Sequence, residues 1–291
     1  MHCFPAALQG TMQNMKRRIL TPNRSVSLAF GLLLFLDATR SLRGEPTAAA
    51  LSAFNSYSAA VESRLVQQHE SQNRFLAPYS GDPKIDEQRL RSGEAIIVRV
   101  TDPISSSLHA GLAGAMLHHW RGTAFAPKAT AVDFERLMRD FNSYPQHFAP
   151  QVVQAEVCSE RGNSIEAWIR IRQKHVITVV MDTTYEVTFG QLDIRHGYSI
   201  SRSTRIDEIA SPGTHAEHRQ SATEEHGFLW RLNTYWSYEE REGGLYLQIE
   251  AVSLTRSIPS GLGWAIGPYI ESIPRESMEF TLNSARQALH M

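Results

Sequence analysis

The chain has 291 residues, of which 42% are hydrophobic and 20% are charged, and its formal net charge is −1 at pH 7. Residues 1–44 hold six of the 29 Lys and Arg residues but only one of the 30 acidic residues, so the remaining part carries 23 basic and 29 acidic side chains. This mildly acidic body excludes the basic footprint of a nucleic-acid-binding protein, and it gives no strong attraction to an anionic membrane.

Residues 1–44 have the pattern of a signal peptide or other targeting segment. Val26–Leu36 is a run without a charge, four Lys and Arg residues lie shortly before it, and Met15 is a second possible start. The run is shorter than the roughly 20 apolar residues of a membrane-spanning helix, and it fits the hydrophobic region of a secretory signal. We predict export to the periplasm or the medium, with membrane anchoring through residues 26–36 as the alternative. The sequence does not fix the cleavage site.

We assign residues 45–110 to an N-terminal extension. From Thr47 to about Phe75, apolar residues recur at helical spacing, which predicts one amphipathic helix. Ala77–Arg91 is polar and contains Pro and Gly, so we expect a loop there. Glu94–Val100 is expected to be a strand, and we predict that the helix and this strand pack on the domain that follows.

A well-defined helix pattern follows a strand predicted over Ala115–Phe125. Four apolar residues from Phe134 to Phe141 fall at i, i+3, i+4 and i+7, which gives a short helix one apolar face. Thr130 and Asp133 stand where a capping pair belongs at its start. A Pro-containing turn, NSYPQHFAP, and a strand, VVQAEV, come next.

The second half of the chain predicts an antiparallel meander. Most segments within residues 152–256 alternate or are β-branched, and short turn signals such as Gly243-Gly244 join consecutive strands. We expect a solvated loop over Ile209–Gly227. Ser257–Ile273 is rich in Gly and Pro yet apolar, which favours a packed loop or a lid. A last helix with one buried stripe is expected over Pro274–Leu289.

The order of helix, Pro-containing turn and strand over residues 131–157 resembles the opening of the START-like superfamily, also called helix-grip, polyketide cyclase-like or SRPBCC. The resemblance covers roughly Gly111 to Leu289. It implies an α+β fold in which an antiparallel sheet wraps around a long C-terminal helix and closes a hydrophobic cavity. We therefore assign residues 111–291 to a START-like ligand-binding domain.

Motifs of nucleophilic, zinc-protease, redox and phosphate-binding chemistry do not occur in the sequence. His215, His218 and His226, with acidic residues between them, form a cluster with metal-ligand character. Their segment is a polar loop without a cysteine, so we interpret it as solvated. We predict no metal and no cofactor.

We expect the cavity to be lined by aromatic, polar and apolar side chains of the strands and the last helix. The candidates are His118, Trp120, Trp168, Tyr185, Trp230, Arg231, Tyr235, Trp236, Glu250, Trp264, Tyr269, Met278 and Leu282. If the strands on either side of Gly243-Gly244 pair, Arg231 and Glu250 share a face of the sheet. On a concave face they would be a polar anchor for a ligand head group, and on an outer face a surface pair that contributes little stability.

Three functions fit these patterns. The absence of a catalytic motif favours an exported, non-catalytic protein that binds a hydrophobic small molecule or a lipid. The first alternative is a cyclase- or hydrolase-type enzyme on the same fold, with His118, Arg231 or Glu250 as acid, base or anchor. The second is a structural or interaction protein with a filled core. An apolar cavity would favour the first function, titratable groups at its floor the second, and the absence of a cavity the third. The oligomeric state and the ligand's identity stay open.

Overall fold

The computed structural model of the chain describes residues 44–71, 74–78, 81–100, 109–174, 178–257 and 263–290, with the backbone alone at 109–110 and 263–271. The predicted targeting segment, apart from Gly44, lies outside these residues. In chain order the elements are α2 (Ala48–His69), α3 (Pro83–Arg91), β1 (Ile96–Arg99), η2 (His109–Leu112), β2 (Ala115–Pro127), α5 (Ala131–Arg139), η3 (Phe141–Ser143), α6 (Tyr144–His147), β3 (Val152–Arg161), β4 (Ser164–Lys174), β5 (Thr178–Asp193), β6 (His196–Ala210), β7 (His218–Arg219), β8 (Arg231–Arg241), β9 (Gly244–Arg256) and α7 (Gly263–Ala288). Within the described ranges, no helix combines the length and the hydrophobicity that crossing a membrane requires.

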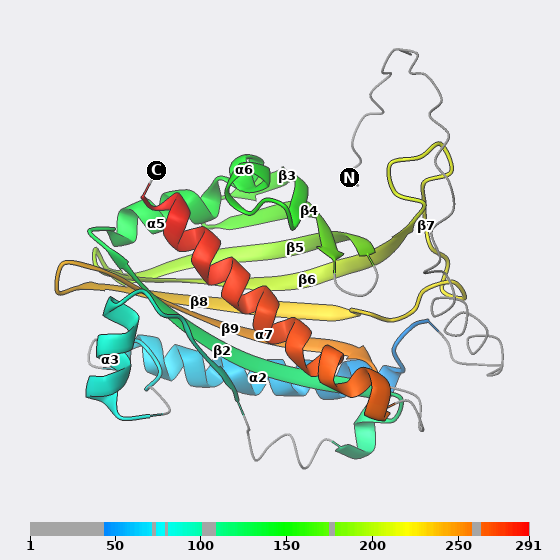
Figure 1. Ribbon diagram of the computed structural model, residues 1–291, viewed down its shortest axis with the longest axis horizontal. Coiled ribbons are helices and arrows are strands. Elements are labelled where there is room, and N and C mark those ends of the chain that lie inside the picture. Colours follow the sequence, from blue (N-terminus) through cyan, green and yellow to red (C-terminus); the bar gives the residue numbers. More distant parts are fainter. Residues whose placement is uncertain are drawn as a thin grey trace, which may run out of the picture. The chain divides into compact units, whose positions relative to one another are not determined.

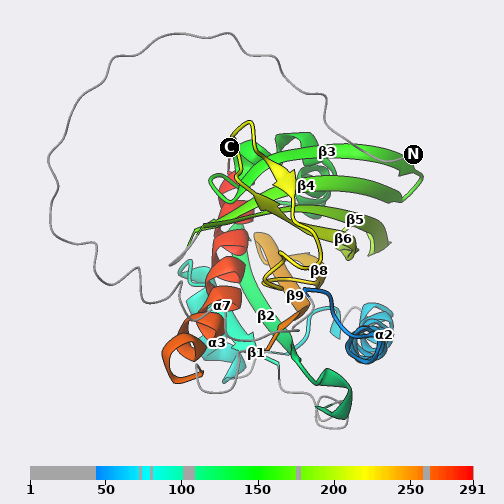
Figure 2. The same cartoon turned by 90° about the vertical axis from the view of Figure 1, so that its right-hand side faces the viewer.

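The strands form one sheet in the order β1-β2-β9-β8-β6-β5-β4-β3, and the short strand β7 pairs with β6. Every pairing is antiparallel, as the short turn signals predicted. Helix α7 crosses one face of the sheet, and α2 lies against the opposite face (Figures 1 and 2). The chain therefore has the predicted α+β helix-grip architecture, an antiparallel sheet with a long C-terminal helix across one face, and a helical N-terminal region is packed on it.

The larger apolar cluster lies between the sheet and α7. Met278, Leu282 and Ala285 are buried along one stripe of α7, and they belong to the same cluster as Trp236 of β8. Gly122 of β2 lies directly beneath this stripe, where a Cβ atom would meet Leu282 and Met278 at 2.7 Å. The absence of a side chain at this position is what lets α7 approach the sheet so closely.

A second apolar cluster lies between the opposite face of the sheet and α2. The Thr47 hydroxyl caps this helix by accepting a hydrogen bond from the backbone N–H of Ala50 at 3.1 Å. Phe54 and Leu65 are buried on the predicted stripe and pack with Leu254 of β9. The predicted packing of the N-terminal helix on the sheet is confirmed, although α2 ends at His69 instead of near Phe75.

The segment that carries the family resemblance folds as predicted. The Thr130 hydroxyl accepts a hydrogen bond from the Asp133 backbone N–H at 3.1 Å, which caps α5. Phe134 and Phe141 are buried in the cluster beneath α7. The following turn contains η3 and α6 and leads into β3.

Helix α7 is longer than predicted, because it begins at Gly263 and not near Pro274. The loop or lid predicted over Ser257–Ile273 is therefore wrong from Gly263 onward, and Pro268 lies inside the helix. Gly and Pro lower helix propensity, but propensity is a weak prior that the rest of a fold overrides.

The polar segment Ala77–Arg91 is also not a loop throughout, since it contains α3. The Asp82 carboxylate accepts a hydrogen bond from the Lys84 backbone N–H at 2.8 Å, and Pro83 occupies the first turn. This helix has few apolar residues, so no stripe marks it in the sequence. Its start signal, Asp followed by Pro, is the one local feature that indicates it.

Candidate ligand-binding site

A pocket of about 310 Å³ lies between α6 and the C-terminal half of α7. Its lining residues are Gln146, His147, Ala149, Phe280, Asn283, Ser284, Gln287 and Ala288. Phe280 and Ala288 also pack against the apolar cluster beneath α7, so the pocket lies at the rim of that core. Small-molecule sites have volumes of roughly 300 to 1,000 Å³, and this pocket falls at the lower end of that range.

Buried aromatic side chains hold α6 in place beside the pocket. The ring centroids of Phe141 and Tyr144 are 4.6 Å apart, and those of Tyr144 and Phe148 are 4.9 Å apart. The Tyr144 hydroxyl donates a hydrogen bond to the Met138 carbonyl oxygen at 2.8 Å, which ties α6 back to α5. Burial raises the pKa of Tyr144 above its ordinary value, so this donor stays protonated.

The polar side chains of the pocket come from both of its walls. Nδ1 of His147 is buried and has no hydrogen-bond partner. On α7, Ser284 is 7% exposed, and the Asn283 side-chain oxygen accepts a hydrogen bond from Arg286 at 3.0 Å. His147 lines the pocket, and its buried nitrogen without a partner is an unfavourable feature that calls for an explanation.

Six of the predicted site residues lie on the α7 side of the sheet. Met278, Leu282, Trp236 and Tyr185 are buried members of the cluster there, and Trp120 packs against it. His118 shares this face because strand positions alternate and Gly122 lies beneath α7. None of the six lines the pocket itself.

Two of these side chains have notable polar groups. Nε1 of Trp120 is buried without a hydrogen-bond partner. Burial raises the pKa of the Tyr185 hydroxyl to about 12, so it is neutral at physiological pH. Both residues lie on the side of the sheet where the predicted cavity belongs.

The structure corrects the predicted placement of three aromatic residues. Trp230 and Tyr235 pack in the cluster beneath α2, away from α7. Trp230 does not share a face with Trp236, because β8 begins only at Arg231 and the strand alternation does not reach position 230. Trp168 also points away from α7, since its strand neighbours Ala167 and Ile169 belong to the cluster beneath that helix.

For Arg231 and Glu250, the alternative in which they form a polar anchor in the ligand cavity is wrong. The two residues share a face as expected, but in the register of β8 and β9 Arg231 lies opposite Leu254 and Glu250 lies opposite Tyr235. Arg231 instead donates a hydrogen bond to the Trp230 carbonyl oxygen at 2.6 Å. The shared face is the one that α2 covers, so this pair cannot anchor a ligand beneath α7.

Trp264 and Tyr269 lie in the first half of α7. Their side chains are outside the described residues, so their predicted contribution to the cavity stays a prediction.

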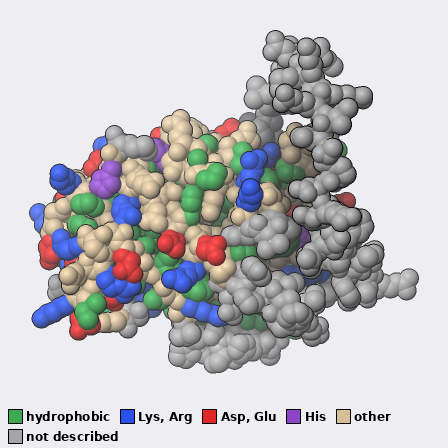
Figure 3. Space-filling model, in the orientation of Figure 1, with side chains coloured by type: hydrophobic (Ala, Val, Ile, Leu, Met, Phe, Trp, Pro, Cys, Tyr) green, Lys and Arg blue, Asp and Glu red, His purple; other side chains and the backbone are tan. Residues whose placement is uncertain are grey.

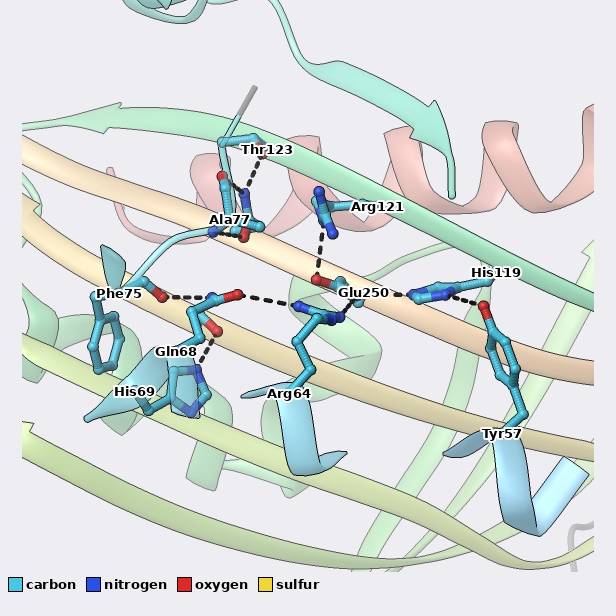
Figure 4. Close-up of polar contacts among 12 residues, drawn as sticks. Tyr57, Arg64, Gln68, His69, Phe75, Ala77, His119, Arg121, Thr123 and Glu250 are labelled. Carbon is cyan, nitrogen blue, oxygen red and sulfur yellow. Dashed lines mark hydrogen bonds and ion pairs between the residues drawn. The ribbon is translucent and has the colours of Figure 1, made fainter. Parts of the chain in front are cut away.

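Glu250 is the centre of a buried polar network between α2 and the sheet (Figure 4). Its carboxylate accepts hydrogen bonds from Arg64 at 2.5 Å, from His119 at 2.8 Å and from Arg121 at 3.0 Å. The other ring nitrogen of His119 lies 2.9 Å from the Tyr57 hydroxyl. We call these five residues the Glu250 network.

The charge state of the Glu250 network follows from its contacts. Glu250 is 1% exposed, and burial alone would raise its pKa. The hydrogen bond from His119 and the positive charges of Arg121 and Arg64 outweigh burial and lower that pKa to about 2. Glu250 is therefore ionised, and the network joins α2 to β2 and β9.

Sequence reasoning missed Tyr57, Arg64, His119 and Arg121 as partners of Glu250. Arg121 and Glu250 lie directly opposite each other in β2 and β9. These strands are far apart in the chain, so no local pattern indicates the pairing. Arg64 was visible only as a polar residue away from the apolar stripe of the predicted helix.

His69 extends the contacts of α2 toward β8. One ring nitrogen lies 2.7 Å from the Ser237 hydroxyl, and the ring stacks on Tyr198 with centroids 4.5 Å apart. Burial, together with the nearby charge of Arg64, lowers the pKa of His69 to about 4. The imidazole is therefore neutral at physiological pH.

Of the histidines in the loop after β6, His226 has a structural role, because its ring Nδ1 lies 2.9 Å from the Glu208 carboxylate. Burial would raise the pKa of Glu208, but its hydrogen bonds with His226 lower it. The same carboxylate accepts hydrogen bonds from the backbone N–H groups of Gly227 and Phe228 at 2.9 and 3.0 Å. Among the described residues, no group of three or more His, Cys, Asp or Glu side chains is placed to hold a metal ion.

Comparisons with known proteins give structural likenesses at low sequence identity. No family model and no curated protein matches the chain. A protein of Thermus thermophilus, TTHA0849, is 14% identical, with a TM-score of 0.42 over 58% of this chain and 94% of that one. A STAR-related lipid transfer protein from Xanthomonas axonopodis is 16% identical, with a TM-score of 0.41 over 67% and 99%. The Zhui aromatase/cyclase from a Streptomyces species is 11% identical, with a TM-score of 0.40 over 60% and 94%.

Proposed function

We propose that this chain is an exported, non-catalytic binding protein for a hydrophobic small molecule or a lipid. In this proposal the ligand reaches the space between the sheet and α7 through the α6–α7 pocket. The observation that carries the proposal is the position of the pocket at the rim of the apolar cluster beneath α7, where Phe280 lines the pocket and also packs against the cluster. A ligand with a polar end in the pocket and an apolar end along Phe280 would fit this arrangement.

The unpaired Nε1 of Trp120 gives independent support. It lies on the face of the sheet that α7 covers, and a buried donor without an acceptor is unfavourable unless something else accepts from it. A polar atom of a bound molecule would remove that penalty.

The main cluster of titratable groups favours binding over catalysis at this site. Glu250 and its basic partners lie on the α2 side of the sheet, and Glu250 is sealed from solvent. An enzyme that works beneath α7 would need its acid, base or anchor on the other face. Of the three groups considered for such a role, only His118 lies there.

The surface on the α7 side fits a neutral partner. Acidic and basic side chains are interspersed over the described part of this face (Figure 3). Alternating signs give no strong field for an anionic membrane or a nucleic acid. The partner we propose is therefore a hydrophobic molecule without a large net charge.

The test is native mass spectrometry of the protein purified from its own host, followed by lipid extraction. We expect a non-protein mass that organic solvent removes. In Ala288→Phe a phenyl ring fills part of the pocket, so bound mass should fall by most of its wild-type amount. The matched control, Glu279→Phe, places the same ring at an exposed position of the same helix and should leave binding unchanged. Wild-type protein without bound mass, or equal occupancy in Ala288→Phe, would contradict the proposal.

Export is a separate part of the proposal, supported by the charge and hydropathy pattern of residues 1–44. Intact-mass measurement of the same preparation should find a chain that begins near residues 39–46. A full-length species in the cytosol would contradict export without affecting ligand binding.

A further inference from the structure

We propose that the α6–α7 pocket selects an amphiphile whose head group is uncharged and bears hydroxyl groups, over one with a carboxylate or an ammonium head. This inference rests on the proposed function, because it names the class of ligand that the same site would take. It follows from the chemistry of the lining, which is polar without carrying a charge.

All the polar side chains that line the pocket are uncharged types or imidazole. They are the amides of Gln146, Asn283 and Gln287, the hydroxyl of Ser284 and the ring of His147. No Lys, Arg, Asp or Glu is among the lining residues. A charged head group would lose part of its hydration here without gaining a partner of opposite sign, and that loss would oppose its binding.

The nearest basic group with a contact to the lining is already engaged. Arg286 donates hydrogen bonds to the Gly93 carbonyl oxygen and to the side-chain oxygen of Asn283. These contacts occupy the guanidinium with acceptors of the protein. They also leave the amide nitrogen of Asn283 as a hydrogen-bond donor for the pocket.

A hydroxyl group matches the unpaired ring nitrogen of His147, which is shielded from solvent here and which a ligand would reach once the ring turns toward the pocket. Nδ1 of His147 is either a donor or an acceptor, depending on the tautomer, and it has no partner in the protein. A hydroxyl both donates and accepts, so it can pair with either tautomer. A carboxylate can only accept and a quaternary ammonium can do neither, so each suits the site less well.

The apolar side chains of the pocket indicate where the rest of the ligand lies. Ala149 and Ala288 add small apolar surface, and Phe280 continues from the pocket into the core beneath α7. A head group among the amides would therefore place its tail along Phe280. The site recognises the two ends of an amphiphile by different chemistry.

The test uses three probes that share one dodecyl-length chain: 1-monolauroylglycerol, laurate and dodecyltrimethylammonium. Each is titrated into the full chain at pH 7.5 by isothermal calorimetry, below its micelle concentration. We expect 1-monolauroylglycerol to bind at least about tenfold more tightly than the other two, as expected when charged heads lose hydration without a counter-charge.

Charge substitutions in the lining provide the second arm. Gln287→Lys and Gln146→Lys each place a cation in an exposed lining position, and each should shift the preference toward laurate by about tenfold through a charge-assisted contact. Glu279→Lys makes a positive change on the exposed face of α7 outside the pocket, and it should not shift the preference. Thermal melts followed by circular dichroism would verify that each variant is folded.

The outcomes separate the two proposals. Equal affinity for the three head groups, or no shift in either lysine variant, would overturn the head-group inference and leave the proposed function standing. Saturable binding of none of the three probes would overturn the head-group inference, and the native mass measurement would then decide the proposed function separately. Preference for 1-monolauroylglycerol that reverses only in the lining variants would support both.

Discussion

Replacement of Glu250 by glutamine removes the negative charge at the centre of the Glu250 network while keeping the side chain's shape. Folding lowers the pKa of this carboxyl from 4.5 to about 2, so its charged form is stabilised by roughly 3 kcal/mol in the folded state. The substitution leaves Arg121, whose side chain is 17% exposed, without its counter-charge. Arg64 is 37% exposed and can be hydrated, so we expect a loss of about 3 kcal/mol, at the lower end for a broken buried pair.

The assay is urea denaturation of the full chain at pH 7, followed by circular dichroism and tryptophan fluorescence. Glu94→Gln is the control, because Glu94 forms an exposed ion pair with Arg89 and its loss should have a much smaller effect. In the double variant Arg121→Met with Glu250→Met, the loss should be less than the sum of the single losses, because no charge is left unpaired. A loss below about 1 kcal/mol in Glu250→Gln, or strict additivity, would refute the reasoning.

The same carboxyl predicts a pH dependence with a defined sign. A group whose pKa is lower in the folded state stabilises the fold above its unfolded pKa, and this stability is lost as the pH falls through the folded pKa. For Glu250 the window runs from pH 4.5 down to about 2. Urea midpoints measured across this window should fall more steeply for the wild type than for Glu250→Gln, and parallel curves would show that Glu250 is not the group responsible.

Three further predictions test other parts of the fold. Because burial lowers the pKa of His69 to about 4, stability should fall as the pH drops from 6.5 to 4, and His69→Gln should flatten the urea midpoints over that window; an unchanged profile would contradict this. Gly122→Val should lower stability by about 1 to 3 kcal/mol, because its side chain would collide with Leu282 and Met278, and an unchanged melting temperature would show that α7 can move away. Trp120→Phe should lower the unfolding free energy only by the packing that the smaller ring gives up, roughly 1 to 2 kcal/mol, because the lost Nε1 has no partner, and a loss well above this would mean that this nitrogen is hydrogen-bonded in solution.

Local patterns in the sequence predicted those elements that carry their own cap and their own apolar stripe. The helix after Thr130 has both a capping residue and a stripe ending at Phe141, and the structure confirms both features. Helix α3 and the first half of α7 were missed. In α3 the polar residues form no stripe, and in α7 residues such as Pro268 oppose the helix that the folded chain adopts.

The candidate site could be predicted only in part, because it depends on which residues meet across the fold. Met278 and Leu282 were correctly placed beneath α7 from their helical spacing. The Arg231 and Glu250 pair required the register of one hairpin, and Leu254, the residue opposite Arg231, is four positions away from Glu250. The pocket joins His147 to residues of the last helix, and no local spacing connects two segments so far apart in the chain.

The contact of Arg64 with Glu250 has a consequence for how the chain folds, since 186 positions separate the two residues. The apolar stripe of α2 leaves the ribosome early and has no sheet to cover it until β8 and β9 have been synthesised. Contacts of such high sequence separation slow folding and leave apolar surface open to aggregation in the meantime. The central strand β9 also has to wait for its partners, because helices that are far apart in the chain, α2 and α7, cover its two faces. We therefore expect this protein to depend on a chaperone between synthesis and the closure of α2 onto the sheet.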